Sequence, residues 1–380
     1  MSNKYFKGLF MVSAALSLMV AIACGSSEEV IKEVEVVKEV EVVKEVEVVK
    51  EVEVIKEVPV EVVKEVPQDP GKLVVYSGRS ESLVGPIIQQ FAEATGVDVQ
   101  VKYGKTGAIA ATLLEEGANS PADVFFAQDP GGLGAVANNG QLSTLNSKIL
   151  DKVPAWAKSD KGLWVGLSGR ARVVVYSTKN GISPSDLPSS ILGFTDPKWN
   201  GRIGWPPTNG SFQALVTAMI VELGEAKTKE WLEGIQANNP TVYPKNTPTV
   251  AAAAAGEIDV GFVNHYYLHR FIAEEGEGFG ARNHHLTSGG PGSLMMVAGA
   301  GILSTAKNQD NAEKFLNFML SKVGQQYFTG STYEYPVIEG VKANPLLTPI
   351  DDINKPKIDM ASLEDLAGTQ KLLREVGLLN

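Results

Sequence analysis

Apolar residues recur with two different periods along the chain from residue 72 onward. Short apolar runs and strict alternation predict strands, whereas apolar residues spaced three and four apart predict helices. Strands that alternate with helices imply a mostly parallel sheet with ligands at the carboxyl ends of its strands. The predicted strands cover residues 73–76, 97–101, 122–126, 170–176, 258–263 and 294–303, and the predicted helices cover residues 83–94, 108–116, 212–223, 250–255 and 311–328.

The strand–helix pattern stops and restarts, which predicts two lobes of ordinary domain size. The loops at residues 77–80 and 127–130 follow strands of the first lobe, so we expect ligand contacts there. The predicted boundaries place the first lobe at residues 72–172, the second lobe at residues 173–297, a return to the first lobe at residues 298–347, and a C-terminal segment packing on the second lobe at residues 348–380.

The N-terminus has the pattern of an export signal. Two lysines precede an apolar run over residues 8–23, which is short for a membrane-spanning helix. The run ends at Cys24, the single cysteine of the chain, and the residues before it resemble a bacterial lipobox. We expect residues 1–24 to be a lipoprotein signal peptide with Cys24 lipidated; the alternative is an ordinary cleaved signal with a spare thiol.

Residues 25–71 separate this signal from the folded part and contain a six-residue Lys-Glu-Val-Glu-Val-Val repeat. An even repeat keeps its register on an extended chain, so we expect an extended stalk, with a solvated disordered tether as the alternative. Residues 28–66 contain 13 Glu and 6 Lys and so supply seven of the ten net negative charges. The acidic balance argues against a nucleic-acid partner.

Two adjacent tyrosines, Tyr266 and Tyr267, follow the predicted strand at residues 258–263. A phenol loses its proton at a pKa of about 10, so it is a poor ligand for most metal ions. A trivalent hard cation prefers oxygen ligands and displaces that proton. The pair therefore predicts half of a ferric site; the alternative places one tyrosine in the core and its neighbour on the surface.

A candidate anion site lies at Asn209, Gly210 and Ser211, directly before the helix predicted at residues 212–223. Free backbone N–H groups at a helix N-terminus bind anions. The alternative is that Asn209 or Ser211 caps the helix.

The folded part, residues 72–380, resembles the type 2 periplasmic solute-binding proteins, and among them the bacterial ferric-ion-binding proteins of iron ABC transporters. This resemblance implies an α/β fold of two lobes, each a mostly parallel sheet flanked by helices. It also implies a ferric ion held with a synergistic carbonate or phosphate. The motifs that carry it are Val75-Tyr76-Ser77-Gly78-Arg79, Ser120-Pro121-Ala122-Asp123-Val124-Phe125, Gly169-Arg170-Ala171-Arg172-Val173-Val174, Asn264-His265-Tyr266-Tyr267 and Glu334-Tyr335-Pro336.

The resemblance assigns the paired phenolate ligands to Tyr266 and Tyr267. It assigns the anion contacts to one helix N-terminus and two amides beside it, namely Asn209, Gly210, Ser211, Asn246 and Asn264.

This sequence departs from many relatives in the first lobe. Their His and Glu ligands are replaced here by Ser80 and Gln128, and the third tyrosine of other relatives is Phe212. Gln128 remains a candidate metal ligand, and Arg79 and Ser80 are candidate anion contacts.

The role that the resemblance implies is capture and import, so we expect no enzymatic activity. The expected partners are an ABC permease and its ATPase, and the expected place is the periplasm or the outer face of the cytoplasmic membrane.

Two other readings remain open at this point. His265 and His269 have a spacing that suits zinc on a helix, and His284 and His285 offer further ligands, but Tyr266 stands where a zinc hydrolase motif needs Glu. Alternatively, the helix N-terminus binds a small organic anion, such as a phosphonate or a carboxylate, without iron.

Overall fold

The computed structural model describes residues 69–380, so the predicted signal peptide, Cys24 and nearly all of the predicted stalk lie outside the described residues. The described residues belong to one compact unit. Within this range, no helix is both long and apolar enough to cross a bilayer.

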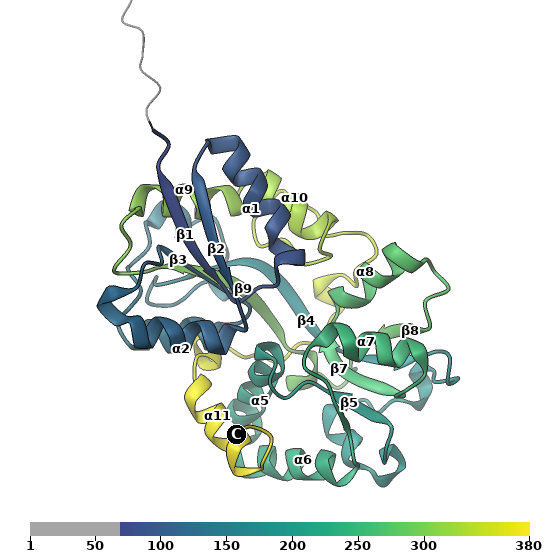
Figure 1. Ribbon diagram of the computed structural model, residues 1–380. Coiled ribbons are helices and arrows are strands. Elements are labelled where there is room, and N and C mark those ends of the chain that lie inside the picture. Colours follow the sequence, from purple (N-terminus) through teal and green to yellow (C-terminus); the bar gives the residue numbers. More distant parts are fainter. Residues whose placement is uncertain (1–68) are drawn as a thin grey trace, which may run out of the picture. The chain divides into compact units, whose positions relative to one another are not determined.

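The described residues form strands and helices in alternation (Figure 1). The strands are β1 Lys72–Ser77, β2 Asp98–Tyr103, β3 Val124–Ala127, β4 Val165–Ser177, β5 Ile203–Trp205, β6 Thr241–Val242, β7 Val260–Asn264, β8 Ala281–His284 and β9 Met295–Ile302. The α-helices are α1 Glu81–Thr95, α2 Thr106–Glu116, α3 Pro130–Asn138, α4 Ser147–Leu150, α5 Gly210–Leu223, α6 Glu225–Ala237, α7 Asn246–Ala255, α8 Tyr266–Glu275, α9 Gln309–Met319, α10 Lys322–Gly330 and α11 Leu366–Glu375.

The strands pair in the order β2-β1-β3-β9-β4-β7-β5-β6, and β8 also pairs with β4. Strand β1 is parallel to β2 and β3, and β5 is parallel to β6 and β7. We call the first of these groups the first lobe and the second group the second lobe. The predicted parallel pairing therefore holds inside each lobe.

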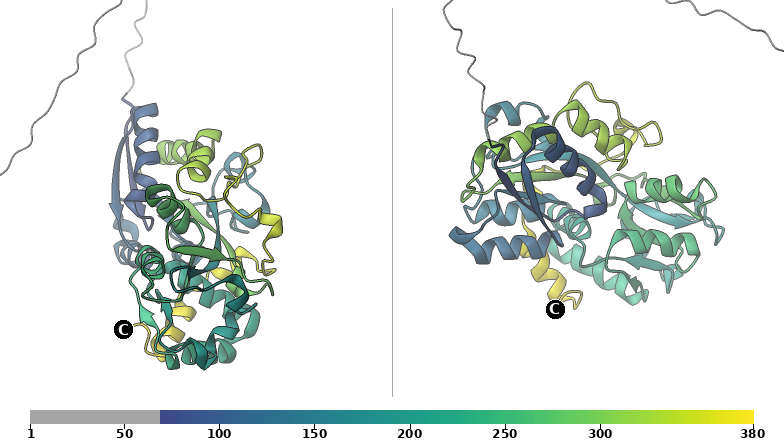
Figure 2. Two further views of the ribbon diagram at one scale, coloured as in Figure 1. Left: turned by 90° about the vertical axis from the view of Figure 1, so that its right-hand side faces the viewer. Right: turned by 45° about the horizontal axis from the view of Figure 1, so that its top comes forward.

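Two long antiparallel strands join the lobes. Strand β9 pairs with β3 of the first lobe, and β4 pairs with β9 as far as Ala171 and with β7 from Arg172 onward. The strand predicted at residues 294–303 is therefore present as β9, and it pairs with a strand of the first lobe. Figure 2 shows the two lobes from two further sides.

Each lobe has its own aromatic packing. In the first lobe the ring of Phe91 on α1 meets Phe315 on α9 edge to face, with 5.3 Å between centroids. In the second lobe Trp231 on α6 packs against Phe262 on β7 at 5.8 Å. Such pairs add to the burial of apolar area that stabilises each sheet.

The C-terminal segment, which we predicted to pack on the second lobe, contacts both lobes. Helix α11 packs against α5 of the second lobe and against α3 of the first. The indole N–H of Trp164 donates to Glu364 Oε1 at 2.8 Å, and the hydroxyls of Thr217 and Thr369 are hydrogen-bonded at 2.7 Å. The segment therefore connects the lobes in addition to β4 and β9.

The single long helix predicted over residues 311–328 is wrong, because the structure has two helices, α9 and α10, with a break after Met319. Ser321 caps α10, since its hydroxyl accepts from the N–H of Gly324 at 3.2 Å. Apolar spacing continues across the break, so the spacing alone does not reveal it. Serine favours the N-cap position, and that preference marks the actual start of α10.

Candidate metal centre

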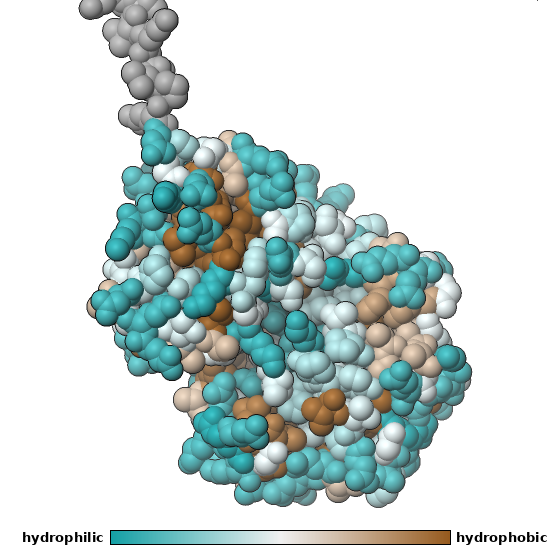
Figure 3. Space-filling model, in the orientation of Figure 1, coloured by the Kyte–Doolittle hydropathy of each residue, from teal (hydrophilic) through white to brown (hydrophobic). Residues whose placement is uncertain are grey.

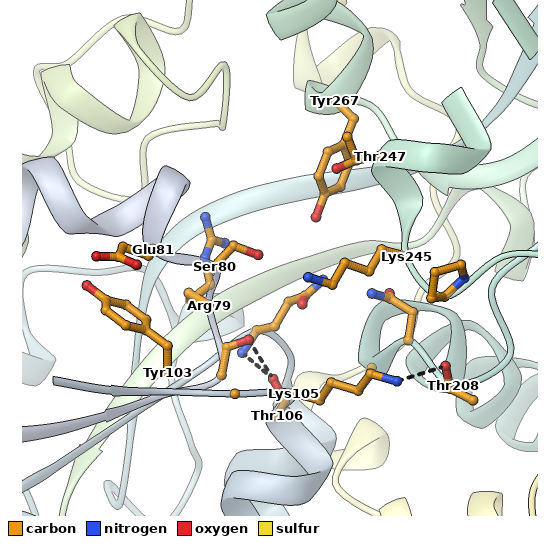
Figure 4. Close-up of a pocket in the computed structure, with 16 residues that line it drawn as sticks. Arg79, Ser80, Glu81, Tyr103, Lys105, Thr106, Thr208, Lys245, Thr247 and Tyr267 are labelled. Atoms are coloured by element: carbon orange, nitrogen blue, oxygen red, sulfur yellow. Dashed lines mark hydrogen bonds between the residues drawn. The ribbon is translucent and has the colours of Figure 1, made fainter. Parts of the chain in front are cut away.

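A cleft of about 390 Å³ lies between the two lobes. In the space-filling view the residues around the hollow between the lobes are mostly hydrophilic (Figure 3). Its first-lobe wall comes from the loops after β1, β2 and β3, and its second-lobe wall from the starts of α5, α7 and α8. The lining residues include Arg79, Ser80, Gln128, Asn209 and Tyr267 (Figure 4).

The tyrosine pair opens helix α8, directly after strand β7. Tyr266 and Tyr267 stack on each other with 4.2 Å between ring centroids, and they are 0% and 7% exposed. The alternative of one core tyrosine and one surface tyrosine is therefore wrong. Tyr267 lines the cleft, and the buried hydroxyl of Tyr266 has no hydrogen-bond partner among the described residues.

Burial raises the pKa of Tyr267 well above its ordinary value, and the neighbouring Tyr266 raises it further. Arg79 and Asn246 act in the opposite direction, but they do not outweigh burial. An ionised Tyr267 in this place therefore needs a positive charge on its oxygen, which a bound cation supplies.

The predicted anion contacts form one hydrogen-bond network centred on Ser211. Its hydroxyl accepts from Gln128 Nε2 of the first lobe at 2.7 Å and from Asn264 Nδ2 of the second lobe at 3.0 Å. Asn209 caps α5 by accepting from the N–H of Ser211 at 3.0 Å, and Asn246 Nδ2 donates to Asn209 at 3.3 Å. Asn209 therefore caps α5, as the alternative interpretation predicted.

Gly210 of the second lobe lies directly against Asp129 of the first lobe. A Cβ atom added there would collide with Oδ2 of Asp129, so only glycine fits. Asp129 is 1% exposed and caps α3 by accepting from the N–H of Gly132 at 3.1 Å. Its Oδ2 has no hydrogen-bond partner within residues 69–380. Burial raises the pKa of Asp129 above its ordinary value.

The terminal nitrogens of Arg79 are not available to bind an anion, because they form a buried ion pair with Glu334. Its two terminal nitrogens donate to the two oxygens of Glu334, each at 2.7 Å, and both side chains are fully buried. The guanidinium also lies 5.9 Å from the centre of the Tyr266 ring. Arg79 therefore contributes its charge to the site from behind the cleft surface.

Two further buried guanidiniums, Arg170 and Arg172, stand on strand β4. Arg172 Nη1 donates to Asn264 Oδ1 at 3.0 Å. All three guanidinium nitrogens of Arg170, and Nε and Nη2 of Arg172, have no partner in the described part of the chain. Burial lowers the pKa of Arg170. Burial also lowers the pKa of Arg172 to about 9, although the nearby Tyr266 and Tyr267 act to raise it. Arg172 is therefore charged at neutral pH.

Two of the histidines that suggested a zinc site, His265 and His269, contact the segment at Tyr333, and His285 lies beside them with its Nδ1 unpartnered among the described residues. His265 Nδ1 accepts from the N–H of Ala171 at 3.1 Å, so its proton is on Nε2, which lies 2.8 Å from the carbonyl oxygen of Tyr333. His269 stacks on the ring of Tyr333. Among residues 69–380, no group of three or more His, Cys, Asp or Glu side chains is arranged to hold a metal ion.

The structure thus brings all the predicted site residues of the folded part to one cleft and the layer behind it. Sequence reasoning missed Asp129, Arg170, Arg172 and Glu334 as parts of this layer. Their only signal was position: Asp129 ends the loop after β3, and Arg170, Arg172 and Glu334 lie in motifs that carry the family resemblance.

The family model of the bacterial extracellular solute-binding proteins matches residues 86–356. The chain belongs to this family. Similar members include the major ferric iron-binding protein of Neisseria meningitidis, with 35% identity over 312 residues that cover 80% of this chain and 93% of the relative. The Fe(3+)-binding periplasmic protein of Serratia marcescens is 32% identical over 309 residues, which cover 81% and 90%.

Solved structures of related proteins agree with this family assignment. Iron-bound HitA from Pseudomonas aeruginosa matches it with a TM-score of 0.78 and 34% identity, covering 81% of this chain and 100% of HitA. A Trichodesmium protein in complex with iron and citrate matches with a TM-score of 0.68 and 30% identity, covering 81% and 100%. The predicted two-lobed α/β fold of the type 2 periplasmic binding proteins is therefore confirmed.

Proposed function

We propose that this solute-binding protein captures ferric iron in the cleft, with Tyr266 and Tyr267 as ligands, and delivers it to the permease of an ABC importer. The observation that carries the proposal is the buried tyrosine pair at the start of α8, with one hydroxyl at the cleft and the other without a partner among the described residues. Phenolate oxygens suit a hard trivalent cation. The relatives named above as ferric iron-binding proteins support the choice of metal.

The protein supplies only part of the coordination sphere. Two phenolates leave one positive charge of a ferric ion uncompensated, so an anion is needed for charge and for ligand oxygens. The Ser211 N–H and the Asn264 amide now donate within the network at the start of α5, and in the proposal a bound anion takes over these donors. Among residues 69–380, Gln128 is the first-lobe side chain that bonds to this network, and its amide oxygen is a candidate ligand.

Capture then follows from the two-lobed fold. Opening about β4 and β9 exposes the tyrosines, and closure brings the Ser80 and Gln128 loops over the bound ion. Export to the periplasm or the outer face of the cytoplasmic membrane, anchoring through lipidated Cys24, and docking on a permease with its ATPase complete the proposal.

The test is the double variant Tyr266→Phe/Tyr267→Phe, which removes both hydroxyls and keeps the rings. Wild type should bind one ferric ion and show a visible phenolate absorption band, and the double variant should show neither. Tyr176→Phe is the control, because Tyr176 on β4 is also buried, 8% exposed, and lies outside the cleft lining. Wild-type iron binding in the double variant would overturn the assignment, and anion binding without iron in wild type would favour the organic-anion reading.

A further inference from the structure

Strand β2 forms one edge of the nine-stranded sheet. Within residues 69–380 it pairs with β1 on one side and with no strand on the other. In the left view of Figure 2 the dark blue strands of the first lobe stand at the outer margin of the molecule. An open edge of this kind presents a row of backbone N–H and C=O groups that a further strand can bind.

The hydrogen bonds to β1 show which backbone groups of β2 face outward. The N–H of Asp98 donates to the carbonyl oxygen of Gly71, directly before β1, at 3.0 Å. In a parallel pair every second residue of a strand bonds to the neighbouring strand, so the even-numbered residues of β2 bond to β1. The N–H and C=O groups of Val99 and Val101 therefore point away from the sheet.

The side chains of β2 alternate as well. Asp98, Gln100 and Lys102 are exposed, whereas Val99 and Val101 are half-buried and pack against the core of the first lobe. In the space-filling view hydrophobic residues gather over β1 and β2 (Figure 3). Edge strands commonly carry charges that discourage unwanted pairing. Here the two charges are opposite in sign, and they lie two residues to either side of Gln100.

We propose that β2 is a docking surface for a second copy of this chain, whose own β2 extends the sheet in antiparallel orientation. A twofold axis at Gln100 places Asp98 of each copy opposite Lys102 of the other, which gives two pairs of opposite charge. The same register places Val99 opposite the other copy's Val101. Their outward N–H and C=O groups then exchange four hydrogen bonds across the axis.

Other registers satisfy the strand less well. A shift by one residue turns the outward backbone groups away from each other. A shift by two residues keeps the hydrogen bonds but places Asp98 or Lys102 opposite Gln100. A shift by four residues brings Asp98 or Lys102 opposite its own copy, so that like charges meet. The hydrogen bonds and the charges are therefore satisfied together in the register centred on Gln100.

The contact is small, because each copy contributes one strand of six residues. Interfaces that bury less than about 1,200 Å² are typical of transient complexes, so we expect a weak dimer that forms as the concentration rises. A twofold contact of this kind closes after two copies. The cleft is lined by other residues than Asp98–Lys102, so the inference does not depend on the proposed function.

The first experiment introduces a cysteine at the axis. Gln100→Cys is combined with Cys24→Ser in the full-length chain, so that the new cysteine is the single thiol. In the proposed register the two Cα atoms at residue 100 lie about 4.5 Å apart, a distance that a disulfide spans. The matched control is Gln326→Cys in the same background, which replaces an exposed glutamine on α10. Oxidation with copper phenanthroline and non-reducing electrophoresis measure the cross-linked fraction.

The second experiment tests the charges by sedimentation equilibrium. Asp98→Lys and Lys102→Asp each place like charges opposite each other, and each should weaken dimerisation on the order of 10-fold. The double variant Asp98→Lys/Lys102→Asp places opposite charges together again and should restore it. Thermal unfolding verifies that each variant is folded, because Lys102 also lies over the ring of Tyr76, with its ammonium 4.6 Å from the ring centre.

Gln100→Cys should form a disulfide-linked dimer at concentrations at which Gln326→Cys stays monomeric, and wild type should dimerise as its concentration rises. The inference is overturned by equal cross-linking of the two cysteine variants or by a wild type that is monomeric at its highest soluble concentration. Single charge variants that dimerise like wild type, or a double variant in which dimerisation is not restored, would also overturn it. Each of these results leaves iron capture in the cleft unaffected.

Discussion

Arg79 and Glu334 form a bidentate ion pair in which both hydrogen bonds are 2.7 Å long. The pair connects the loop after β1 with the segment after α10. Thr332 supports the carboxylate by donating its hydroxyl to Glu334 Oε2 at 3.0 Å. The pair lies against the ring of Tyr266 and fixes the floor of the candidate metal centre.

Glu334→Gln should destabilise the protein by about 3–5 kcal/mol, because it leaves the Arg79 guanidinium buried without a counter-charge. Chemical denaturation of the iron-free protein measures this loss. Arg79→Met combined with Glu334→Gln removes both charges and should recover part of the stability. A single variant as stable as wild type would contradict the pairing.

The same carboxylate should make stability depend on acid pH. Burial alone would raise the pKa of Glu334, but Arg79 and the hydrogen bonds lower it below its ordinary 4.5. A group with a lowered folded-state pKa stabilises fully above its unfolded pKa and loses that contribution as pH falls through the folded value. The unfolding free energy of wild type should therefore fall below about pH 4.5, and the difference from Glu334→Gln should shrink over the same interval.

Tyr266→Phe should weaken iron binding without destabilising the protein. Its hydroxyl is buried without a partner among the described residues, so its removal should leave the unfolding free energy unchanged or raise it by about 1 kcal/mol. Iron affinity should fall by more than the roughly 10- to 100-fold that follows loss of an outer-shell partner, since a direct ligand is lost. Thermal unfolding of the iron-free protein and iron titration measure the two effects, and a stability loss as large as the affinity loss would indicate a structural role.

Gly210→Ala should hinder closure, because the new methyl group collides with Asp129 across the two lobes. The cost of such overpacking is about 1–3 kcal/mol, which corresponds to roughly a 5- to 150-fold loss of affinity for iron. Gly330→Ala in α10 is the matched control, since no atom lies within 4 Å of the added Cβ there. Small-angle scattering should show a more open Gly210→Ala protein.

The sequence reveals those parts of the fold and site that depend on neighbouring residues. Apolar periodicity predicts β1, α1 and β9 to within a few residues, and the adjacent tyrosines are visible as a pair without any fold. The start of α5 is visible because Asn and Gly precede an apolar helix.

The parts that depend on distant residues are not visible in the same way. Arg170 and Arg172 stand in a strand whose every residue is buried, and nothing in their spacing distinguishes a buried guanidinium from an exposed one. The partner of Arg79 lies 255 residues away, and Ser211 joins two lobes through Gln128 and Asn264. Such contacts arise only when segments far apart in the sequence meet in the folded protein.

The C-terminal segment has a consequence for the energetics of capture. Glu364 is hydrogen-bonded to Trp164 of the first lobe, and a few residues later Thr369 is hydrogen-bonded to Thr217 of the second lobe. So short a stretch between two anchors limits how far the lobes can swing apart. We expect this connection to limit how far the empty protein opens, so that less conformational freedom is lost when cargo enters and the affinity gains by that difference.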